Sequence, residues 1–428
     1  MRPRRSAFSV RKERLRVGRQ RGVELLHVSN GRLAATLCPT RGLGIIEAQC
    51  DGVRLGWDSP VREIVHPRHV NLARDGGIGW LDGFNEFVVR CGLQNIGRPG
   101  WDDAPAGRTM LTLHGKIANL PARAVRVRRT RRELVASGRV TERTAAGGVL
   151  ELASEFSCRA GARGFTLRET ITNRGARPEE FSILYHINVG PPLLGRGAQF
   201  LAPIRAAAPM NARAARRMAT LARYDDPRAG RPEDVFALRL RGDRRGRTLV
   251  ALVNPAGTRA VSLAFSLREL PCLTLWKQLG GAGERYVTGL EPGTNYPQHR
   301  RVERRQGRLR LLAPGEVHRM TIDFRVHAGA AEIRRLRRRI ATLQVPRARG
   351  QRPRFVRRRS AHTRSELDHQ SSRRFMEFSM ARRLFSSLSP LPTNPSCSNS
   401  RRSLSFCRSN SYVDSGSRSP RQTCTKAC

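Results

Sequence analysis

The feature that most constrains the fold is a long succession of short apolar runs, bounded by Gly, Pro or Asn, between residues 23 and 328. In residues 165–173 apolar and polar side chains largely alternate, except that Glu169 interrupts the apolar face. This alternation is typical of a strand with one buried face. Similar runs at 181–188, 248–253, 261–266 and 320–326 predict further strands. The sequence therefore predicts an all-β fold, an antiparallel sandwich or barrel.

Changes in composition predict three regions along the chain. Residues 1–22 form a basic N-terminal segment without further features, and residues 23–343 form the β domain, closed by a helix over 329–343. Residues 344–428 are rich in Ser and Arg and poor in aliphatic side chains, so they cannot bury a core and are predicted to be disordered. This tail is either a read-through or frame-shifted end without a selected function, or a true Arg/Ser-rich tail that contacts RNA, a membrane or a partner.

The formal net charge of +46 would normally point to a nucleic-acid partner or an anionic surface. The positive charge is almost entirely arginine and is spread along the chain, which is what a GC-rich coding sequence produces regardless of function. Lysine occurs at only four positions, Lys12, Lys116, Lys277 and Lys426. We therefore expect non-specific polyanion binding by counterion release, and no specific nucleic-acid partner.

The location of the protein follows from what the sequence lacks. No run approaches the roughly 18 apolar residues of a membrane span, and the basic N-terminus lacks the apolar core of a secretory signal. The nine cysteines are odd in number, and none forms a C-x-x-C pair. We expect a cytoplasmic protein with reduced thiols, without a membrane partner, a disulfide framework or a metal site. The oligomeric state is left open.

Two polar groups in strand-and-turn contexts are candidates for a ligand site. His114 precedes a glycine where a strand ends, so its imidazole lies beside backbone that a ligand can approach closely. His186 and Asn188 are two residues apart in a predicted strand and therefore share a face. The alternatives are an incidental turn histidine and a solvent-facing pair.

A third group lies near the end of the β domain. Glu291 stands between a strand-like run and a predicted Pro-Gly turn, with Asn295 close by, and is a candidate base. Just upstream, Trp276 offers a stacking face and Lys277 a donor. A surface glutamate and an ordinary core tryptophan are the competing interpretations.

The order of six segments resembles aldose 1-epimerases and, more closely, a group of bacterial aldose-epimerase-like proteins. The segments are Pro-Thr-Arg-Gly-Leu-Gly-Ile at 39–45, Gly-Trp-Leu-Asp-Gly-Phe-Asn-Glu at 79–86, Arg-Cys-Gly-Leu at 90–93, Leu-His-Gly at 113–115, Tyr-His-Ile-Asn at 185–188 and Leu-Glu-Pro-Gly-Thr-Asn at 290–295. The resemblance covers residues 23–328. It implies a large antiparallel β-sandwich of the galactose mutarotase-like supersandwich type.

The resemblance also implies roles for single residues. It makes His186 the general acid on the ring oxygen of an aldose and Glu291 the base on the C1 hydroxyl. It makes His114 a sugar ligand. The further sugar contacts that we expect are Arg90, Arg41, Asn188, Asn295, Trp276 and Lys277. The family's longer Asn-His-x-x-Phe-Asn stretch is here Tyr-His-Ile-Asn, and the glutamate is followed by Pro-Gly instead of Thr-Gln.

These residue types suit anomer interconversion. A base removes the C1 hydroxyl proton, an acid protonates the ring oxygen, and the opened sugar rotates about C1–C2 before it closes again. We expect His186 to start protonated beside the Glu291 carboxylate. No cofactor is expected, and the partner is a small sugar or sugar derivative. The alternatives are a carbohydrate-binding protein on the same fold that is non-catalytic or catalyses another reaction, and an arginine-rich polyanion binder.

The predicted disorder of the tail can be tested by removing residues 345–428. Because these residues bury little apolar surface, we expect the shortened chain to keep the midpoint of thermal unfolding of the full chain. Differential scanning calorimetry of both proteins at matched salt measures this. A midpoint lower by several degrees would mean that the tail packs on the β domain.

Overall fold

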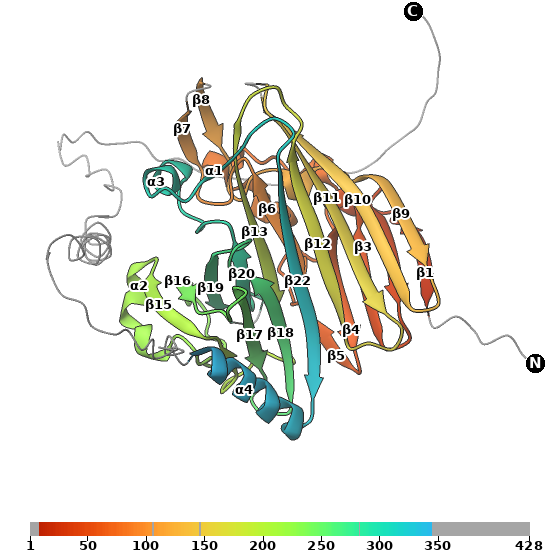
Figure 1. Ribbon diagram of the computed structural model, residues 1–428, viewed down its shortest axis with the longest axis vertical. Coiled ribbons are helices and arrows are strands. Elements are labelled where there is room, and N and C mark those ends of the chain that lie inside the picture. The colour runs from red at the N-terminus through yellow and green to blue at the C-terminus, as the bar shows by residue number, and fades with distance from the viewer. Residues whose placement is uncertain (1–7, 105–106, 145–146, 282, 345–428) are drawn as a thin grey trace, which may run out of the picture. The chain divides into compact units, whose positions relative to one another are not determined.

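Two large antiparallel sheets pack face to face in the computed structural model, which describes residues 8–104, 107–144, 147–281 and 283–344 (Figure 1). The twelve-stranded sheet contains β1 (Ser9–Arg14), β2 (Glu24–Ser29), β3 (Leu33–Cys38), β4 (Gly44–Cys50), β5 (Val53–Leu55), β6 (Val88–Leu93), β13 (Glu179–Val189), β15 (Ile204–Pro209), β16 (Asp234–Leu240), β19 (Cys272–Leu279), β20 (Tyr286–Gly293) and β21 (Arg310–Leu312). The eight-stranded sheet contains β9 (Arg123–Arg129), β10 (Glu133–Arg143), β11 (Val149–Arg159), β12 (Gly164–Asn173), β14 (Gln199–Leu201), β17 (Arg247–Val253), β18 (Arg259–Ser266) and β22 (Val317–Ala328).

The remaining elements are short, apart from the last helix. β7 (Gly100–Ala104) and β8 (Gly107–Leu111) form a separate hairpin. The α-helices are α1 (Arg74–Gly77), α2 (Ala212–Arg216), α3 (Arg300–Arg305) and α4 (Ala330–Gln344). The 3-10 helices are η1 (Gly18–Gln20), η2 (Pro39–Arg41), η3 (Pro67–His69), η4 (Gly79–Gly83), η5 (Ile117–Asn119) and η6 (Met218–Thr220). None of the helices among the described residues is long and apolar enough to cross a membrane.

The main core lies between the two sheets. Strands of the eight-stranded sheet alternate buried and more exposed residues, as in β11 and β12, because their outer face is open. In β13, by contrast, the nine residues from Phe181 to Val189 are all buried. Its neighbours are β6 and β20; one of its faces meets the main core, and a second apolar cluster covers the other. A central strand covered on both faces is a suitable place for a desolvated site.

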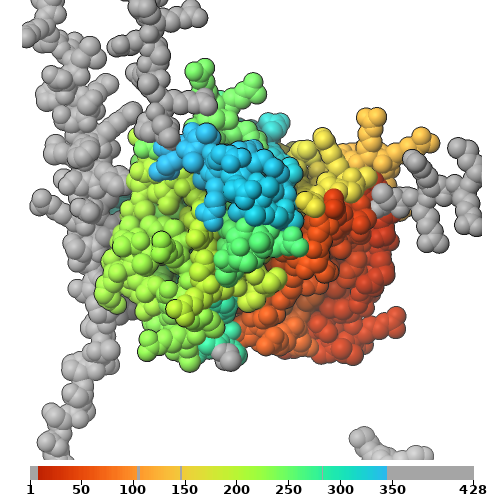
Figure 2. Space-filling view, turned by 90° about the horizontal axis from the view of Figure 1, so that it is seen from below, coloured from red at the N-terminus to blue at the C-terminus, as the bar shows by residue number. Residues whose placement is uncertain are grey.

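Six elements predicted from the sequence are present in the structure. All five predicted strands are present, as β12, β13, β17, β18 and β22, and the helix predicted over 329–343 is α4. Ile333, Leu336 and Ile340 of α4 pack on the eight-stranded sheet, and Figure 2 shows this helix in blue on the surface of the molecule. The predicted fold class, a large antiparallel β-sandwich, is confirmed.

Two predictions about segments were wrong. Residues 9–14, assigned to a featureless N-terminal segment, form the edge strand β1, which pairs with β2 along its whole length. The turn predicted at Pro292 and Gly293 is not there, because both residues continue β20 and pair with β19. The predicted disorder of residues 345–428 lies outside the described residues.

A buried polar group joins the two sheets. Arg90 of β6 donates from Nε to Oε1 of Glu169 at 2.9 Å and from Nη1 to the carbonyl of Leu43 at 2.6 Å. Tyr185 of β13 donates its hydroxyl to the other oxygen of Glu169 at 2.7 Å. Arg90 and Glu169 are each at most 2% exposed. The acidic residue that interrupts the apolar face of β12 is thus paired across the sandwich.

Removing one partner of this pair tests its importance. We expect Glu169→Ala to lower the free energy of unfolding by about 3–5 kcal/mol, because Arg90 is left buried and unpaired. Urea unfolding followed by tryptophan fluorescence measures the change. Arg168, the neighbour of Glu169 in β12, forms an exposed ion pair of 3.1 Å with Glu155. Glu155→Ala should therefore lower the free energy of unfolding by less than about 1 kcal/mol. Equal losses of unfolding free energy in Glu169→Ala and Glu155→Ala would contradict the idea that burial makes the Arg90–Glu169 pair important.

Candidate active site

The candidate site lies on the face of the twelve-stranded sheet that points away from the main core. The register of β13 and β20, with Asn188 opposite Gly289, places His186 across from Glu291. On the next strand, Thr274 of β19 is paired directly with Glu291. Residues opposite one another in an antiparallel sheet point to the same face. The strand register therefore produces one polar row, His186, Glu291 and Thr274.

The imidazole and the carboxylate of this row touch. His186 Nε2 lies 3.2 Å from Glu291 Oε1, and the two residues are 5% and 2% exposed. Gly289 leaves the space for this contact, because a Cβ at that position would lie 2.2 Å from Glu291 Oε1. The fold thus brings together the two residues that the sequence analysis predicted to be catalytic.

Aromatic rings enclose the pair. The ring of Trp276 lies 5.2 Å from that of His186, and the ring of Phe84 lies 5.0 Å away on an edge-to-face contact. Trp80, in η4, packs between Phe84 and His114, at 4.7 and 4.6 Å. These rings belong to the second apolar cluster. They shield the pair from bulk water.

His114 completes the cluster from a turn. Its ring lies 5.5 Å from that of His186, and its Nδ1 lies 2.7 Å from the carbonyl of Ile96. Because a carbonyl only accepts, Nδ1 carries the proton and Nε2 is left with a lone pair. His114 has a φ of 57°, a left-handed backbone that non-glycine residues adopt rarely and that is often found at functional sites.

Burial sets the protonation of the cluster. It raises the pKa of Glu291 well above its usual range, and the Glu233 carboxylate raises it further. It lowers the pKa of His186 well below its usual range, and His114 adds to this. It also lowers the pKa of His114 to about 4. These directions run against the expectation that His186 starts protonated beside the Glu291 carboxylate, because loss of hydration disfavours the charged form of both groups.

Several buried polar atoms in this region have no hydrogen-bond partner among the described residues. They include Glu291 Oε1, Thr274 Oγ1 and the indole nitrogen of Trp80, from residues at most 2% exposed. Buried donors and acceptors are normally satisfied, so such atoms call for an explanation. One donor, one acceptor and one hydroxyl in one aromatic enclosure match the needs of a ligand that carries hydroxyl groups.

Two predicted sugar ligands lie on the wrong face of the sheet. Arg90 follows Val89 in β6 and points into the main core, where it binds Glu169. Lys277 follows Trp276 in β19 and also points away from the site; its Nζ donates to the carbonyls of Leu221 and Arg223 at 3.0 and 2.7 Å. Because successive side chains of a strand point to opposite faces of the sheet, neither side chain reaches the cluster. The structure therefore does not support the sugar contacts expected of Arg90 and Lys277.

Three others have polar atoms that are paired within the protein. Arg41 is completely buried and donates to Glu86 Oε1 at 2.8 Å and to the carbonyl of Gly83 at 2.9 Å, so its nitrogens are used inside the protein. Asn188 binds His186 Nδ1 at 2.6 Å. Asn295 accepts from Thr294 Oγ1 at 2.9 Å and donates to a neighbouring carbonyl. The polar groups of these three residues are thus paired inside the protein, and their contact with a sugar stays a prediction.

The sequence analysis gave no role to other residues of the site. Thr274 was detectable, since it shares a strand face with the nominated Trp276. Trp80 and Phe84 lie in the segment 79–86, one of the six segments that carry the resemblance to aldose 1-epimerases. Glu233 accepts a hydrogen bond from the Trp276 indole at 2.7 Å across 43 residues, and no local pattern indicates such a contact.

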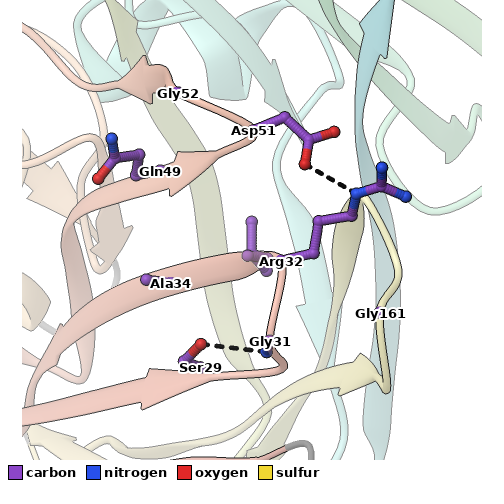
Figure 3. Close-up of a pocket in the computed structure, with 9 residues that line it drawn as sticks. Ser29, Gly31, Arg32, Ala34, Gln49, Asp51, Gly52 and Gly161 are labelled. Atoms are coloured by element: carbon purple, nitrogen blue, oxygen red, sulfur yellow. Dashed lines mark hydrogen bonds and ion pairs between the residues drawn. The ribbon is translucent and has the colours of Figure 1, made fainter.

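A shallow hollow elsewhere does not compete with this site. Figure 3 shows it between the β2–β3 and β4–β5 turns, lined by Ser29, Arg32, Gln49 and Asp51 with several glycines. Arg32 and Asp51 already form an ion pair of 2.7 Å across it. The described residues also hold no group of three or more His, Cys, Asp or Glu side chains arranged for a metal ion.

Comparison with known proteins identifies the family of this chain. The profile of the domain of unknown function DUF4432 matches residues 20–326. This chain belongs to that family. A Klebsiella pneumoniae structure described as a candidate aldose 1-epimerase shares 37% identity with it, at a TM-score of 0.75 over 79% of this chain and 88% of that one. The comparison with curated proteins gave no match.

More distant structures share the fold of this DUF4432 protein. A galactose mutarotase-like protein from Clostridium acetobutylicum has 13% identity and a TM-score of 0.53, over 75% of this chain and 99% of that one. An Escherichia coli K12 protein described as a candidate aldose 1-epimerase has 16% identity and a TM-score of 0.50, over 72% and 100%. The resemblance to the galactose mutarotase-like superfamily is confirmed, and the fold with it.

The neutral burial of His114 predicts a dependence of stability on pH. Between its unfolded pKa of about 6.5 and its folded pKa of about 4, only the unfolded chain takes up the proton, so stability falls as pH falls through this window. We expect His114→Gln to lose less stability than the natural protein between pH 7 and pH 4. Urea unfolding at several pH values measures this. Parallel curves for the two proteins would contradict the assignment.

Proposed function

We propose that this DUF4432 protein interconverts the anomers of a sugar, as an aldose 1-epimerase does. The observation that carries the proposal is the contact of 3.2 Å between His186 and Glu291 inside an aromatic enclosure. The likeness to the Klebsiella pneumoniae protein agrees with it. An imidazole and a carboxyl group side by side supply one proton acceptor and one proton donor.

The reaction needs two proton transfers at adjacent oxygens. The hydroxyl oxygen and the ring oxygen of a cyclic aldose are both bonded to C1, so two catalytic atoms 3.2 Å apart can address both. One group removes the hydroxyl proton while the other protonates the ring oxygen, and the C1–O5 bond breaks. Rotation about C1–C2 and the reverse transfers give the other anomer. Such paired acid and base groups contribute about 10²–10⁴-fold each.

The surroundings of the pair suit the rest of a sugar. Trp276 is held in place by its hydrogen bond to Glu233 and presents its ring beside His186. With Nδ1 bound to the Ile96 carbonyl, Nε2 of His114 is the ring nitrogen that can accept a hydrogen bond from a sugar hydroxyl. Thr274 Oγ1 and the Trp80 indole have unused hydrogen-bonding capacity. An apolar enclosure with a few polar atoms of this kind is typical of small-molecule sites. We propose a neutral or weakly charged aldose as the ligand.

Anomer exchange tests this proposal directly. Saturation-transfer NMR on a panel of aldoses and sugar acids compares the exchange rate with that of buffer alone. We expect acceleration by the natural protein and a loss of roughly 10²-fold or more in Glu291→Gln, which keeps the shape of the side chain but cannot exchange a proton at that oxygen. Glu155→Gln, on the open face of the other sheet, is the matched control and should keep the full rate.

The alternative is a carbohydrate-binding protein without catalysis on the same fold. It is favoured by the near-complete burial of His186 and Glu291, which leaves little room for a substrate between them. No acceleration for any sugar, combined with line broadening that Trp276→Ala abolishes, would establish that alternative. Neither acceleration nor binding of any sugar in the panel would reject both.

A further inference from the structure

Arg285 lies just before β20 begins, on the face of the sheet that carries the candidate site. We propose that Arg285 binds a carboxylate of the sugar, so that the protein acts on aldoses that carry an acid group. The inference rests on the proposed function and narrows its ligand to the singly charged case. It concerns the choice of substrate and not the proton transfers, so Arg285 is a specificity-determining residue.

Strand alternation fixes the direction of the Arg285 side chain. Glu291, Gly289 and Val287 of β20 are two residues apart and share a face, and Arg285 continues this series. Val287 belongs to the second apolar cluster, so this is the face of the site. The backbone carbonyl of Arg285 accepts from the amide of Gly280 at 2.8 Å, which extends the pairing of β19 and β20 to this residue. Arg285 therefore stands at the outer end of the row that begins with Glu291.

The neighbouring strand β16 brings a carboxylate to the same end of the site. Glu233 immediately precedes β16 and shares a face with Val235, which pairs with Trp276 of β19. Glu233 Oε2 accepts the indole proton of Trp276 at 2.7 Å, which confirms this direction. We call Arg285 and Glu233 the rim of the site. The rim thus carries one cationic and one anionic side chain.

The guanidinium of Arg285 has no hydrogen bond or ion pair with any residue that the structure describes. The side chain is half-buried, and loss of hydration lowers its pKa, while the Glu233 carboxylate acts in the opposite direction without forming an ion pair. A ligand that covers the enclosure would take further water from this cation. Burying a charge without a partner is costly, so a ligand with its own anionic group is favoured over a neutral one.

The rim is close enough to the catalytic pair for one small ligand to contact both. The charge of Arg285 contributes to the lowered pKa of His186, and that of Glu233 to the raised pKa of Glu291. In a pyranose with a carboxylate on C5, the acid group and C1 lie on opposite sides of the ring oxygen. A contact between that carboxylate and Arg285 would therefore help to hold C1 and the ring oxygen at His186 and Glu291.

The charges of the rim favour a carboxylate over a phosphate ester. A guanidinium and a carboxylate match in shape and form two parallel hydrogen bonds. A phosphate ester carries up to two negative charges at neutral pH, so the Glu233 carboxylate repels it more strongly. Arg217 and Arg231, which lie near β16, are already paired with Asp225. A singly charged group is thus the better match for the rim.

The preference can be measured as binding, without catalysis. Tryptophan fluorescence of the full chain is titrated at fixed ionic strength with D-glucuronate and D-galacturonate, with D-glucose and D-galactose, and with D-glucose 6-phosphate. We expect at least one uronate to bind more tightly than its neutral counterpart. Arg285→Gln should weaken the binding of that uronate by about 10–100-fold, the usual effect of losing a hydrogen bond between charged groups. Arg285→Lys should restore part of the affinity.

Two further variants separate the rim from the general positive charge of the chain. Glu233→Gln removes the negative charge beside Arg285 but can still accept the Trp276 indole proton, so it should tighten uronate binding. Arg128→Gln is the matched control, because Arg128 is an exposed arginine of β9 in the other sheet. It should leave uronate binding unchanged.

Anomer exchange gives the second readout. Arg285→Gln should raise KM for the uronate with little change in kcat, since Arg285 contacts none of the reacting atoms. A loss of kcat at unchanged KM would instead place Arg285 among the groups that act in the transition state and would contradict a role in substrate choice. Circular dichroism confirms that each variant is folded.

Three results would overturn the inference. The first is a natural protein that binds uronates no more tightly than neutral hexoses. The second is an equal loss of uronate binding in Arg285→Gln and Arg128→Gln. The third is tighter binding of D-glucose 6-phosphate than of any uronate, which would exclude the carboxylate as the preferred group. If uronates bind through Arg285 but no anomers are exchanged, the proposed function fails and the binding site stands. If neutral hexoses are exchanged and uronates do not bind, the function stands and this inference fails.

Discussion

The register between β13 and β20 is the constraint on which the candidate site depends. It places His186 opposite Glu291 in the middle of a twelve-stranded sheet, where both faces are covered and both side chains are almost completely buried. A slip of one residue would send either side chain to the main core. The backbone ladder, rather than a flexible loop, thus sets the spacing of the two groups that we propose for catalysis.

Buried charges keep this register and its surroundings rigid. The two sheets are joined by the hydrogen bonds among Arg90, Glu169 and Tyr185. The segment that leads into β6 is held by the hydrogen bond from Arg41 to Glu86. These groups are satisfied within the protein, and each satisfied group restricts the positions of its neighbours. Atoms without a hydrogen-bond partner among the described residues, such as Thr274 Oγ1 and the indole nitrogen of Trp80, lie where we propose that the ligand binds.

The same burial that organises the site works against stability. Glu291 is buried next to an imidazole instead of a full cation, and its pKa is raised as a result. His114 is held neutral and in a left-handed backbone conformation. Sites often carry such costs, which the rest of the fold must offset. The extensive core between the two sheets provides that stabilisation.

The sequence by itself determined the fold class, five of the strands and the last helix, because period-two alternation is a local signal. It also nominated His114, His186 and Glu291, and their roles stay a prediction that the family resemblance implies. It assigned the N-terminal strand β1 to a featureless segment, since an exposed edge strand of charged residues has no apolar pattern. Only the tertiary structure decided which arginines reach the site: Arg41 and Arg90 are committed to Glu86 and Glu169, partners 45 and 79 residues away. Hydration loss, which lowers the pKa of His186, likewise depends on the packing of distant aromatic rings and cannot be predicted from neighbours along the chain.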